Sequence, residues 1–323
     1  MVLTEFTKQL NQWGKDGIPF LFLVDFELQK PLAFTLDSID PAWLRYNFNG
    51  VTNSKRSHPS SNGVEVSVSP ISLSDYQQKF EKVYKHLAYG DSFLTNLTIR
   101  TPIQVNKTLA ELFELSEAKY KFLFKDNFLV FSPECFVKIE KGRIFSYPMK
   151  GTIDASVPEA ESILLSDEKE MAEHVTIVDL IRNDLSMVAE NVRVTKFRYV
   201  DRIKTHESTL LQVSSEIVGD LPKGFQKEIG TILASLLPAG SISGAPKRKT
   251  VDIIQAAEGE ARGYYTGVMG YFDGEHLDSA VMIRYIEQVD AKLYYRSGGG
   301  ITTQSSCEKE YQEALAKVYV PVV

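Results

Sequence analysis

Two pairs of glutamates stand three residues apart in segments that the sequence predicts to be helical. Glu170 and Glu173 open a long helix expected over residues 168–188, and Glu310 and Glu313 lie in a final helix that begins near residue 308. Residues three apart are neighbours on a helix surface, so the carboxylates of each pair crowd together. Such crowding in a partly buried place raises the pKa of a carboxyl group unless a cation joins the pair.

Apolar stripes decide whether these pairs face the protein or the solvent. At ~100° per residue, the first stripe is formed by Met171, Val175, Val178, Ile181 and Leu185, and the glutamates fall on the arc shared by Ile177 and Leu180. The last helix has a stripe of Tyr311, Ala314, Leu315 and Val318, with Glu310, Glu313 and Lys317 within an arc of ~60° at its edge. Glu-x-x-Glu also occurs on solvated helix faces, but two pairs beside apolar stripes favour a site for Mg²⁺ and an anionic substrate.

A hairpin is expected over residues 128–149. Together with its continuation, it contains Glu134 and Lys150. A two-residue loop pairs Lys138 with Phe145, whereas a three-residue loop gives one apolar face and sets Glu134 opposite Lys150. We expect the three-residue loop. A lysine in a partly dry site can act as a nucleophile and a glutamate as a general acid. The alternative is a structural ion pair.

Two glycine-rich segments have the composition of anion-binding loops. They are residues 238–247, which end in Lys247, and residues 297–301. Backbone N–H groups in such loops bind carboxylates or phosphates, although plain turns have the same composition. Arg284 lies in the strand-like segment 280–286 and is expected either to clamp a carboxylate or to cap a sheet edge.

The composition limits the class of protein. The chain has 323 residues with 36 Lys and Arg, 42 Asp and Glu, and 43% hydrophobic residues, which excludes a disordered, collagen-like or coiled-coil protein. The net charge of −6 argues against a general nucleic-acid binder. Two cysteines make neither a disulfide framework nor a zinc pattern, so we expect a cytoplasmic protein. The apolar run at 18–24 is too short to span a membrane.

The elements that must position these residues alternate irregularly between helix and strand. We expect a helix and a strand within 1–30, a loop at 47–63, helices at 73–88 and 108–119, a strand at 93–99 and a helix near 225–237. The length fits either two domains or one large one.

Several motifs, taken in order, resemble those of the chorismate-utilising enzymes. They are Ser132-Pro133-Glu134, Pro148-Met149-Lys150-Gly151-Thr152, Glu170-x-x-Glu173 leading into 177–185, Gly240 to Lys247, Arg262-Gly263-x-Tyr265, Ile283-Arg284, Gly298-Gly299-Gly300-Ile301 and Glu310-x-x-Glu313. The resemblance covers roughly residues 70–323. It implies one large α/β domain of the α+β type, with two stacked, mostly antiparallel sheets and helices outside. Residues 1–70 would be a short N-terminal part of the same fold, and 71–323 the catalytic domain.

The resemblance also implies roles. Mg²⁺ would lie near Glu170, Glu173, Glu310 and Glu313 and bind a carboxylate of chorismate. The substrate would be held by Thr152, Gly244, Tyr265, Arg284, Gly298, Gly299, Gly300 and Lys317. Glu134 would be the general acid that protonates the departing 4-hydroxyl group.

Within the family, Lys150 is typical of the aminodeoxychorismate synthases (component I), whereas anthranilate synthases typically carry Ala there. In the former, the lysine is thought to attack C2 of chorismate before ammonia adds at C4, on the route to p-aminobenzoate and folate. Isochorismate and salicylate synthases use a lysine that activates water, and Leu94 stands at that position here. Gln212 replaces a histidine of the anthranilate synthases. The short N-terminal part indicates that a full tryptophan pocket is absent.

The ammonia of such enzymes normally comes from a separate glutamine amidotransferase. Neither Cys135 nor Cys307 lies in a nucleophile elbow, so a partner subunit is expected. Two alternatives remain open: anthranilate synthase component I, and a non-catalytic subunit that binds a metal or an anion.

Overall fold

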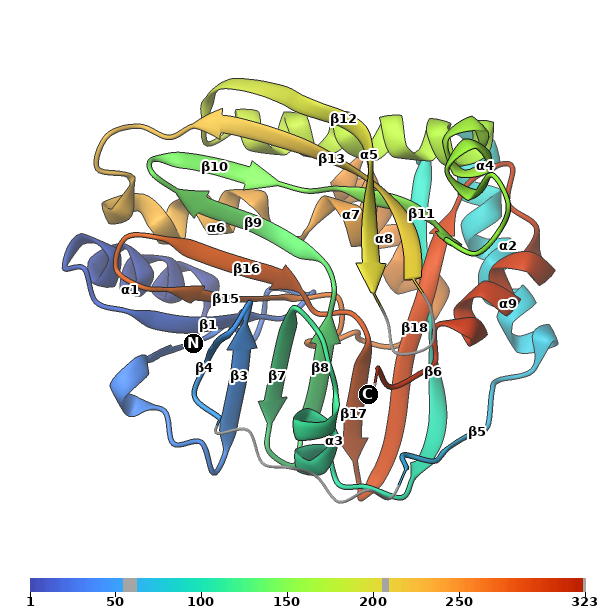
Figure 1. Cartoon of the computed structure of the whole chain (residues 1–323), viewed down its shortest axis with the longest axis horizontal. Helices are drawn as coiled ribbons and strands as arrows, with labels where there is room; N and C mark the ends of the chain where they lie inside the picture. The colour runs from blue at the N-terminus through green and yellow to red at the C-terminus, as the bar shows by residue number, and fades with distance from the viewer. Residues whose placement is uncertain (55–62, 205–208, 322–323) are drawn as a thin grey trace.

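The strand β1 (Phe20–Val24) shows how the layers are built, because all five of its residues are buried. Phe20, Phe22 and Val24 pack against helices, whereas Leu21 and Leu23 pack between the two sheets. A strand covered on both faces needs an unbroken apolar run rather than an alternating one. The computed structural model, which describes residues 1–54, 63–204 and 209–321, therefore has a three-layer arrangement at this point (Figure 1).

Two antiparallel sheets make up the centre of the molecule. The first sheet contains β1, β2 (Leu32–Thr35), β9 (Cys135–Glu140), β10 (Arg143–Ser146), β11 (Met149–Asp154), β12 (Glu190–Lys204), β13 (Thr209–Asp220), β15 (Val268–Phe272) and β16 (Leu277–Val281). The second contains β3 (Leu44–Phe48), β4 (Val51–Thr52), β5 (Val66–Val68), β6 (Leu94–Val105), β7 (Tyr120–Phe124), β8 (Phe128–Ser132), β14 (Gly244–Ala245), β17 (Tyr285–Val289) and β18 (Lys292–Ile301). Strands from the first 70 residues join both sheets. The expected α/β fold with two stacked, mostly antiparallel sheets is confirmed.

Helices cover the outer faces. Around the first sheet lie α1 (Leu3–Lys15), α4 (Ala160–Ser166), α5 (Glu168–Ser186) and α6 (Ile229–Leu236), which follows the 3₁₀ turn Phe225–Glu228. Against β6 and β18 lie α2 (Leu73–Tyr89), α8 (Lys247–Glu258) and α9 (Cys307–Ala316), and α3 (Leu109–Leu115) packs near β7 and β8. In the described ranges, no helix is long and apolar enough to cross a membrane.

Two of the places where the chain passes from one sheet to the other lie next to each other. One joins β8 to β9 and carries Glu134, and the other joins β16 to β17 and carries Arg284. The N–H of Val281 donates to the carbonyl of Glu134 at 3.1 Å, and that of Phe131 donates to the carbonyl of Arg284 at 3.1 Å. The two crossings therefore run side by side and hold both residues where the sheets meet.

Most elements follow the expected pattern, with one change in the N-terminal part. The segment expected as a loop at 47–63 begins instead with the β3–β4 hairpin, and its residues 55–62 lie outside the described ranges. Arg284 is also not within a strand, because β16 ends at Val281 and β17 begins at Tyr285; it adopts a left-handed backbone with φ 54°.

The register expected for the β9–β10 hairpin is wrong. Glu140 pairs with Arg143 and Lys138 with Phe145, so the loop has two residues, Lys141 and Gly142. Both have positive φ, 51° and 73°, which is the geometry of the two-residue turn that matches strand twist. After this hairpin the chain leaves β9, and β11 pairs with β13 instead. Glu134 therefore does not stand opposite Lys150 in a strand pair.

The apolar stripe expected on α5 is wrong in its first half. Met171 and Val175 are 40% and 48% exposed, whereas Glu173 and His174 are buried. The later stripe residues Val178, Ile181 and Leu185 are buried as expected, together with Ile177. The inward position of Glu173 agrees with the arc that it shares with Ile177, whereas apolar spacing gave no indication that His174 is buried.

Candidate active site

Lys150 lies at the centre of a group of carboxylates. Its Nζ is 2.6 Å from Oε2 of Glu173, and the two side chains are 25% and 8% exposed. Burial alone lowers the pKa of Lys150, but Glu173, Glu170 and Glu313 together raise it above its ordinary value. Three of the four predicted metal ligands therefore act on this one ammonium group.

The second acidic pair reaches the same place from α9. Glu310 is buried and its Oε1 accepts a hydrogen bond from Ser305 at 2.7 Å, while Glu313 is more exposed. Lys317 Nζ donates to Glu313 at 2.6 Å and to the carbonyl of Gly298 at 2.9 Å. Burial, together with Glu173, Asp167 and Glu313, raises the pKa of Glu170 although Lys150 opposes them. The expected crowding of carboxylates from α5 and α9 is thus present.

Two glycines of β18 let the backbone approach these groups closely. A β-carbon at Gly299 would lie 3.4 Å from Oε1 of Glu313 and 3.5 Å from Oε2 of Glu310. One at Gly300 would lie 3.4 Å from Nζ of Lys150 and 3.0 Å from Cδ1 of Leu94. Neighbouring strand residues point to opposite faces, so Gly299 brings the backbone of β18 close to the acidic residues of α9 and Gly300 brings it close to Lys150.

The glycine segments are not loops, contrary to expectation. Gly298, Gly299 and Gly300 lie in β18, paired with β6. Residues 240–243 form the short helix α7, and Gly244 (φ 135°) pairs with β6, where a β-carbon would meet the Leu94 carbonyl. Lys247 forms an ion pair with Asp184 at 2.7 Å, so its charge is matched within the protein and not left for a substrate anion. In these segments the glycines allow strands and side chains to approach the backbone closely. They do not form loops of exposed N–H groups.

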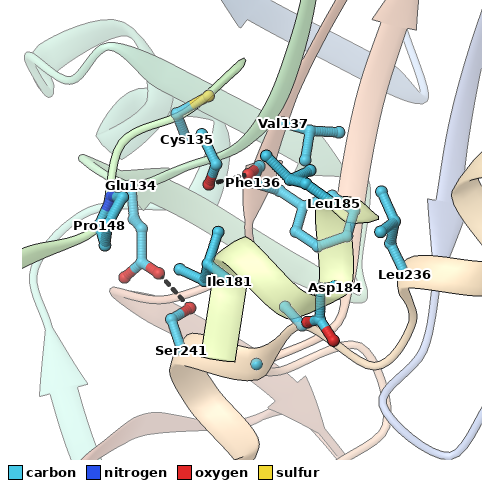
Figure 2. A pocket seen from close by; sticks show the side chains of 13 residues that line it. Glu134, Cys135, Phe136, Val137, Pro148, Ile181, Asp184, Leu185, Leu236 and Ser241 are labelled. Carbon is cyan, nitrogen blue, oxygen red and sulfur yellow. Dashed lines mark hydrogen bonds between the residues drawn. The ribbon is translucent and has the colours of Figure 1, made fainter. Parts of the chain in front are cut away.

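Glu134 approaches the site from the crossing between the sheets. Ser241 of α7 donates a hydrogen bond to its carboxylate (Figure 2). Burial raises the pKa of Glu134, opposed by Ser241 and by the charges of Lys150, Arg284 and Lys317. A carboxyl group that keeps its proton above the ordinary range, and that feels these three cations, is suited to act as an acid.

Of the remaining predicted substrate residues, Arg284 and Tyr265 lie near this centre. Arg284 stacks over the Tyr319 ring at 5.2 Å, and its charge reaches both Glu134 and Tyr265. Tyr265 is buried, which raises the pKa of its hydroxyl group to about 12, so it stays neutral and can donate a hydrogen bond. Thr152 is exposed on β11, opposite Gln212.

The donor set fits a hard divalent cation. Within the described ranges, no three acidic, histidine or cysteine side chains are gathered closely enough to hold a metal as they stand. The ammonium groups of Lys150 and Lys317 bind Glu173 and Glu313, and so place positive charge among these carboxylates. These carboxylates thus attract positive charge, and carboxylate oxygens are the ligands that Mg²⁺ uses.

Two features of the site have no simple sequence signal. His174 Nε2 and Ser215 Oγ are 2.7 Å apart, and burial lowers the pKa of His174 to about 4, so this neutral ring ties α5 to β13 beside Glu173. Ser241 lies in a predicted motif, but its bond to Glu134 depends on two segments 107 positions apart. Only the three-dimensional fold brings such partners together.

Comparisons with known proteins agree with this geometry. Residues 27–322 match the model of the chorismate binding enzyme family. A Pasteurella multocida protein described as an uncharacterized PabA-like protein is 54% identical over 323 residues, the whole length of both chains. Aminodeoxychorismate synthase component 1 of Bacillus subtilis is 32% identical over 266 residues, which cover 77% of this chain and 55% of the relative.

A solved structure supports the same conclusion. Anthranilate synthase component I from Streptococcus pneumoniae superposes with a TM-score of 0.68 at 28% identity, over 81% of this chain and 60% of the other. The family match begins near residue 27, before the first of the catalytic motifs. This chain belongs to the family of chorismate-binding enzymes.

Proposed function

We propose that this protein is an aminodeoxychorismate synthase component I, which aminates chorismate at C4 to give 4-amino-4-deoxychorismate. One observation carries the proposal: the Nζ of Lys150 lies beside the backbone of Gly300 and among carboxylates of α5 and α9. These carboxylates raise the pKa of Lys150, so the lysine would act as a nucleophile once a bound cation offsets their charge and its proton has left.

The first half of the reaction uses Lys150 and Glu134. Lys150, as the neutral amine after its proton has passed to solvent, forms a bond to C2 of chorismate. Both ring double bonds shift, the C4–O bond breaks, and Glu134 gives its proton to the departing hydroxyl group, which leaves as water. Glu134 suits this step because burial keeps its carboxyl group protonated above the ordinary range.

In the second half of the reaction, the bond between Lys150 and C2 is broken. Ammonia attacks C4, both ring double bonds shift back, and Lys150 leaves C2 as the neutral amine. The carboxylate of Glu134, formed in the first half, then takes a proton from the new ammonium group at C4. Chorismate and ammonia are thereby converted to 4-amino-4-deoxychorismate and water, and both side chains return to their starting states.

Chorismate carries two carboxylates, and the site offers cations for both. Arg284 and Lys317 lie near Glu134, and neutral Tyr265 adds a hydrogen-bond donor. Glu170, Glu173, Glu310 and Glu313 would hold Mg²⁺. When bound, the ion would supply positive charge for a substrate carboxylate and would offset the acidic charge of these side chains.

The source of ammonia lies outside the described part of this chain. Burial raises the pKa of Cys135 to about 12, and burial together with Glu81 and Glu308 raises that of Cys307. Neither thiol is therefore primed to attack glutamine at neutral pH. A glutamine amidotransferase subunit is the proposed partner, and the product would serve p-aminobenzoate synthesis.

The nearest alternative is anthranilate synthase component I, because solved and curated relatives include that enzyme. Product analysis separates the two. Purified protein is incubated with chorismate, ammonium chloride and Mg²⁺, and the products are identified by chromatography and mass spectrometry. We expect 4-amino-4-deoxychorismate from the wild type and a fall to background for Lys150→Ala.

Other products would change the assignment. Anthranilate with pyruvate would identify an anthranilate synthase, and full activity of Lys150→Ala would refute the covalent role of the lysine. If no nitrogen source supports turnover, the result favours the alternative of a non-catalytic subunit that binds a metal or an anion. Lys141→Ala, in the exposed turn between β9 and β10, is the matched control for loss of a lysine.

A further inference from the structure

A small pocket lies behind Glu134, on the side of α5 and α7. Its walls include apolar side chains of Ile181, Leu185, Leu236 and Ala239, together with Glu134 and Ser241 (Figure 2). It has room for about one molecule the size of water. None of the substrate residues that β18 or α9 contribute line it. The pocket is therefore separate from the space between Lys150 and the acidic residues.

Glu134 is the wall that this pocket shares with the substrate site. Its carboxyl group accepts the hydrogen bond of Ser241, which lines the pocket. The same carboxyl group feels the charges of Lys150, Arg284 and Lys317. A molecule that enters the pocket therefore meets the group that faces C4 in the proposed reaction.

The lining selects against ions. Most of its surface is apolar, and moving an ion into such surroundings is costly, whereas a small neutral molecule pays far less. The other acidic group of the pocket, Asp184, is bound by Lys247 at 2.7 Å, so that end holds a matched pair of charges. In Figure 2 Glu134 and Asp184 lie on opposite sides of the view.

We propose that this pocket admits neutral ammonia to the Glu134 side of the substrate. The inference rests on the proposed amination. In that reaction ammonia must reach C4 where the hydroxyl group leaves, and Glu134 marks that side because it protonates the leaving group. The bond-forming step is the one given above, with Glu134 taking the proton of the new C4 ammonium group.

Narrowing the pocket tests the proposal. Ala239→Val adds two methyl groups to its wall, far from Lys150 in sequence and outside the proposed catalytic residues. With saturating chorismate and varied ammonium chloride at fixed pH, we expect the KM for ammonia to rise at least about tenfold, which corresponds to about 1.4 kcal/mol. The KM for chorismate should stay within about twofold, since none of the cations that would hold it lines the pocket.

A matched variant controls for the strain of the added methyl groups. Ala257→Val makes the same change at a buried position of α8, in the core beneath α2 and β6. Overpacking of this kind costs about 1–3 kcal/mol in stability at either place. Only the change at Ala239 should alter the KM for ammonia.

Widening the pocket gives an independent test if Ala239→Val does not fold. Ile181→Ala removes three carbons from the wall, and Ile181→Val removes one at a cost of about 0.5–1.5 kcal/mol. With methylamine as the only nitrogen source, the widened variants should form the 4-methylamino product at least about tenfold faster than the wild type.

The outcomes separate this inference from the proposed function. Wild-type amination with an unchanged KM for ammonia in folded Ala239→Val, or no gain of methylamine use in the folded Ile181 variants, overturns the pocket assignment and leaves the function standing. The absence of wild-type turnover with any nitrogen source overturns both.

Discussion

A β-carbon on Gly300 would lie 3.4 Å from the Nζ of Lys150, so the residue that carries no side chain is the one that faces the proposed nucleophile. The same β-carbon would lie 3.0 Å from Cδ1 of Leu94. The glycine lies in the regular strand β18 and is not among the glycines with positive φ, so backbone freedom does not require it there. A side chain here would press against Leu94 and touch Lys150, which is the physical reason for glycine at this position.

Gly300→Ala should therefore reduce activity more than stability. The methyl group enters the space proposed for C2 of the substrate, while Leu94 can move its flexible end by a few tenths of an ångström. We expect kcat/KM for chorismate to fall about 10- to 30-fold, and the midpoint of thermal unfolding to change by a few degrees at most. Steady-state kinetics and thermal unfolding measure the two effects.

Gly63→Ala is the control for this substitution, because no atom lies within 4 Å of the position of its β-carbon. Wild-type activity is expected for it. A Gly300→Ala enzyme with unchanged kcat/KM would show that this space is not used by the substrate.

Glu134 should act in its protonated form, and its pKa lies above the ordinary value because it is buried. Activity should therefore persist above the ordinary range of a glutamate and fall as the pH rises through the raised pKa. Glu134→Gln removes the proton donor, and kcat should drop about 10²- to 10⁴-fold. Ser241→Ala removes a bond that favours the carboxylate, so the alkaline limb of the pH profile should move to higher pH.

The same shift predicts the effect of Glu134 on stability. The folded protein holds this proton more tightly than the unfolded chain, so unfolding free energy falls as the pH rises from the ordinary pKa of glutamate to the raised one. Glu134→Gln should flatten that fall and leave the neutral-pH stability equal to or above that of the wild type. Urea unfolding across this pH range measures it, and a strongly destabilised Glu134→Gln would contradict a protonated, buried carboxyl group.

The four glutamates should make activity depend on Mg²⁺. Glu310→Gln removes the charge of a buried carboxylate, so the Mg²⁺ concentration for half-maximal activity should rise at least about tenfold. EDTA should abolish turnover, and added Mg²⁺ should restore it. Glu117→Gln, on an exposed residue after α3, is the control and should leave the Mg²⁺ dependence unchanged. Full activity in EDTA would remove the metal from the proposal.

The sequence was a reliable guide where local patterns decide structure. The helical spacing of Tyr76, Phe80, Val83 and Leu87 predicts α2, and all four residues are buried. The pairing of Glu134 with Lys150 was wrong because the β9–β10 turn adopts left-handed backbone at Lys141 and Gly142, after which β11 pairs with β13. Strand partners far apart in sequence are set by the packing of the whole sheet, and apolar alternation in one hairpin does not specify them.

At the start of α5, the arc shared with Ile177 predicted the inward position of Glu173, whereas the burial of His174 was beyond a pattern of hydrophobic spacing. Met171 and Val175 carry the apolar pattern yet face outward, whereas Glu173 and His174 face inward. Two specific contacts outweigh hydrophobicity there: the ion pair of Glu173 with Lys150, and the short contact of His174 with Ser215. Functional sites often break such local rules, because buried polar groups are kept for chemistry and must find partners.

Leu94 provides a final test, because it lines the space beside Lys150 with an apolar side chain. Its side chain is a hydrocarbon and offers a water molecule no hydrogen-bond partner. Replacing it by lysine offers a polar group that can hold and activate water next to C2. Leu94→Lys should therefore form some product of water addition at C2, and its rate of amination should fall at least about tenfold. Chromatography of the products from one reaction gives the ratio of the two.

The control is Leu94→Met, which keeps the volume and the apolar character of the side chain and costs less than about 1.5 kcal/mol in stability. It should give only the aminated product, at a rate close to that of the wild type. If Leu94→Lys folds, as judged by its thermal unfolding, and still gives only the aminated product, then the residue does not decide between water and ammonia. The choice would then rest with Glu134 and the way in which ammonia reaches it.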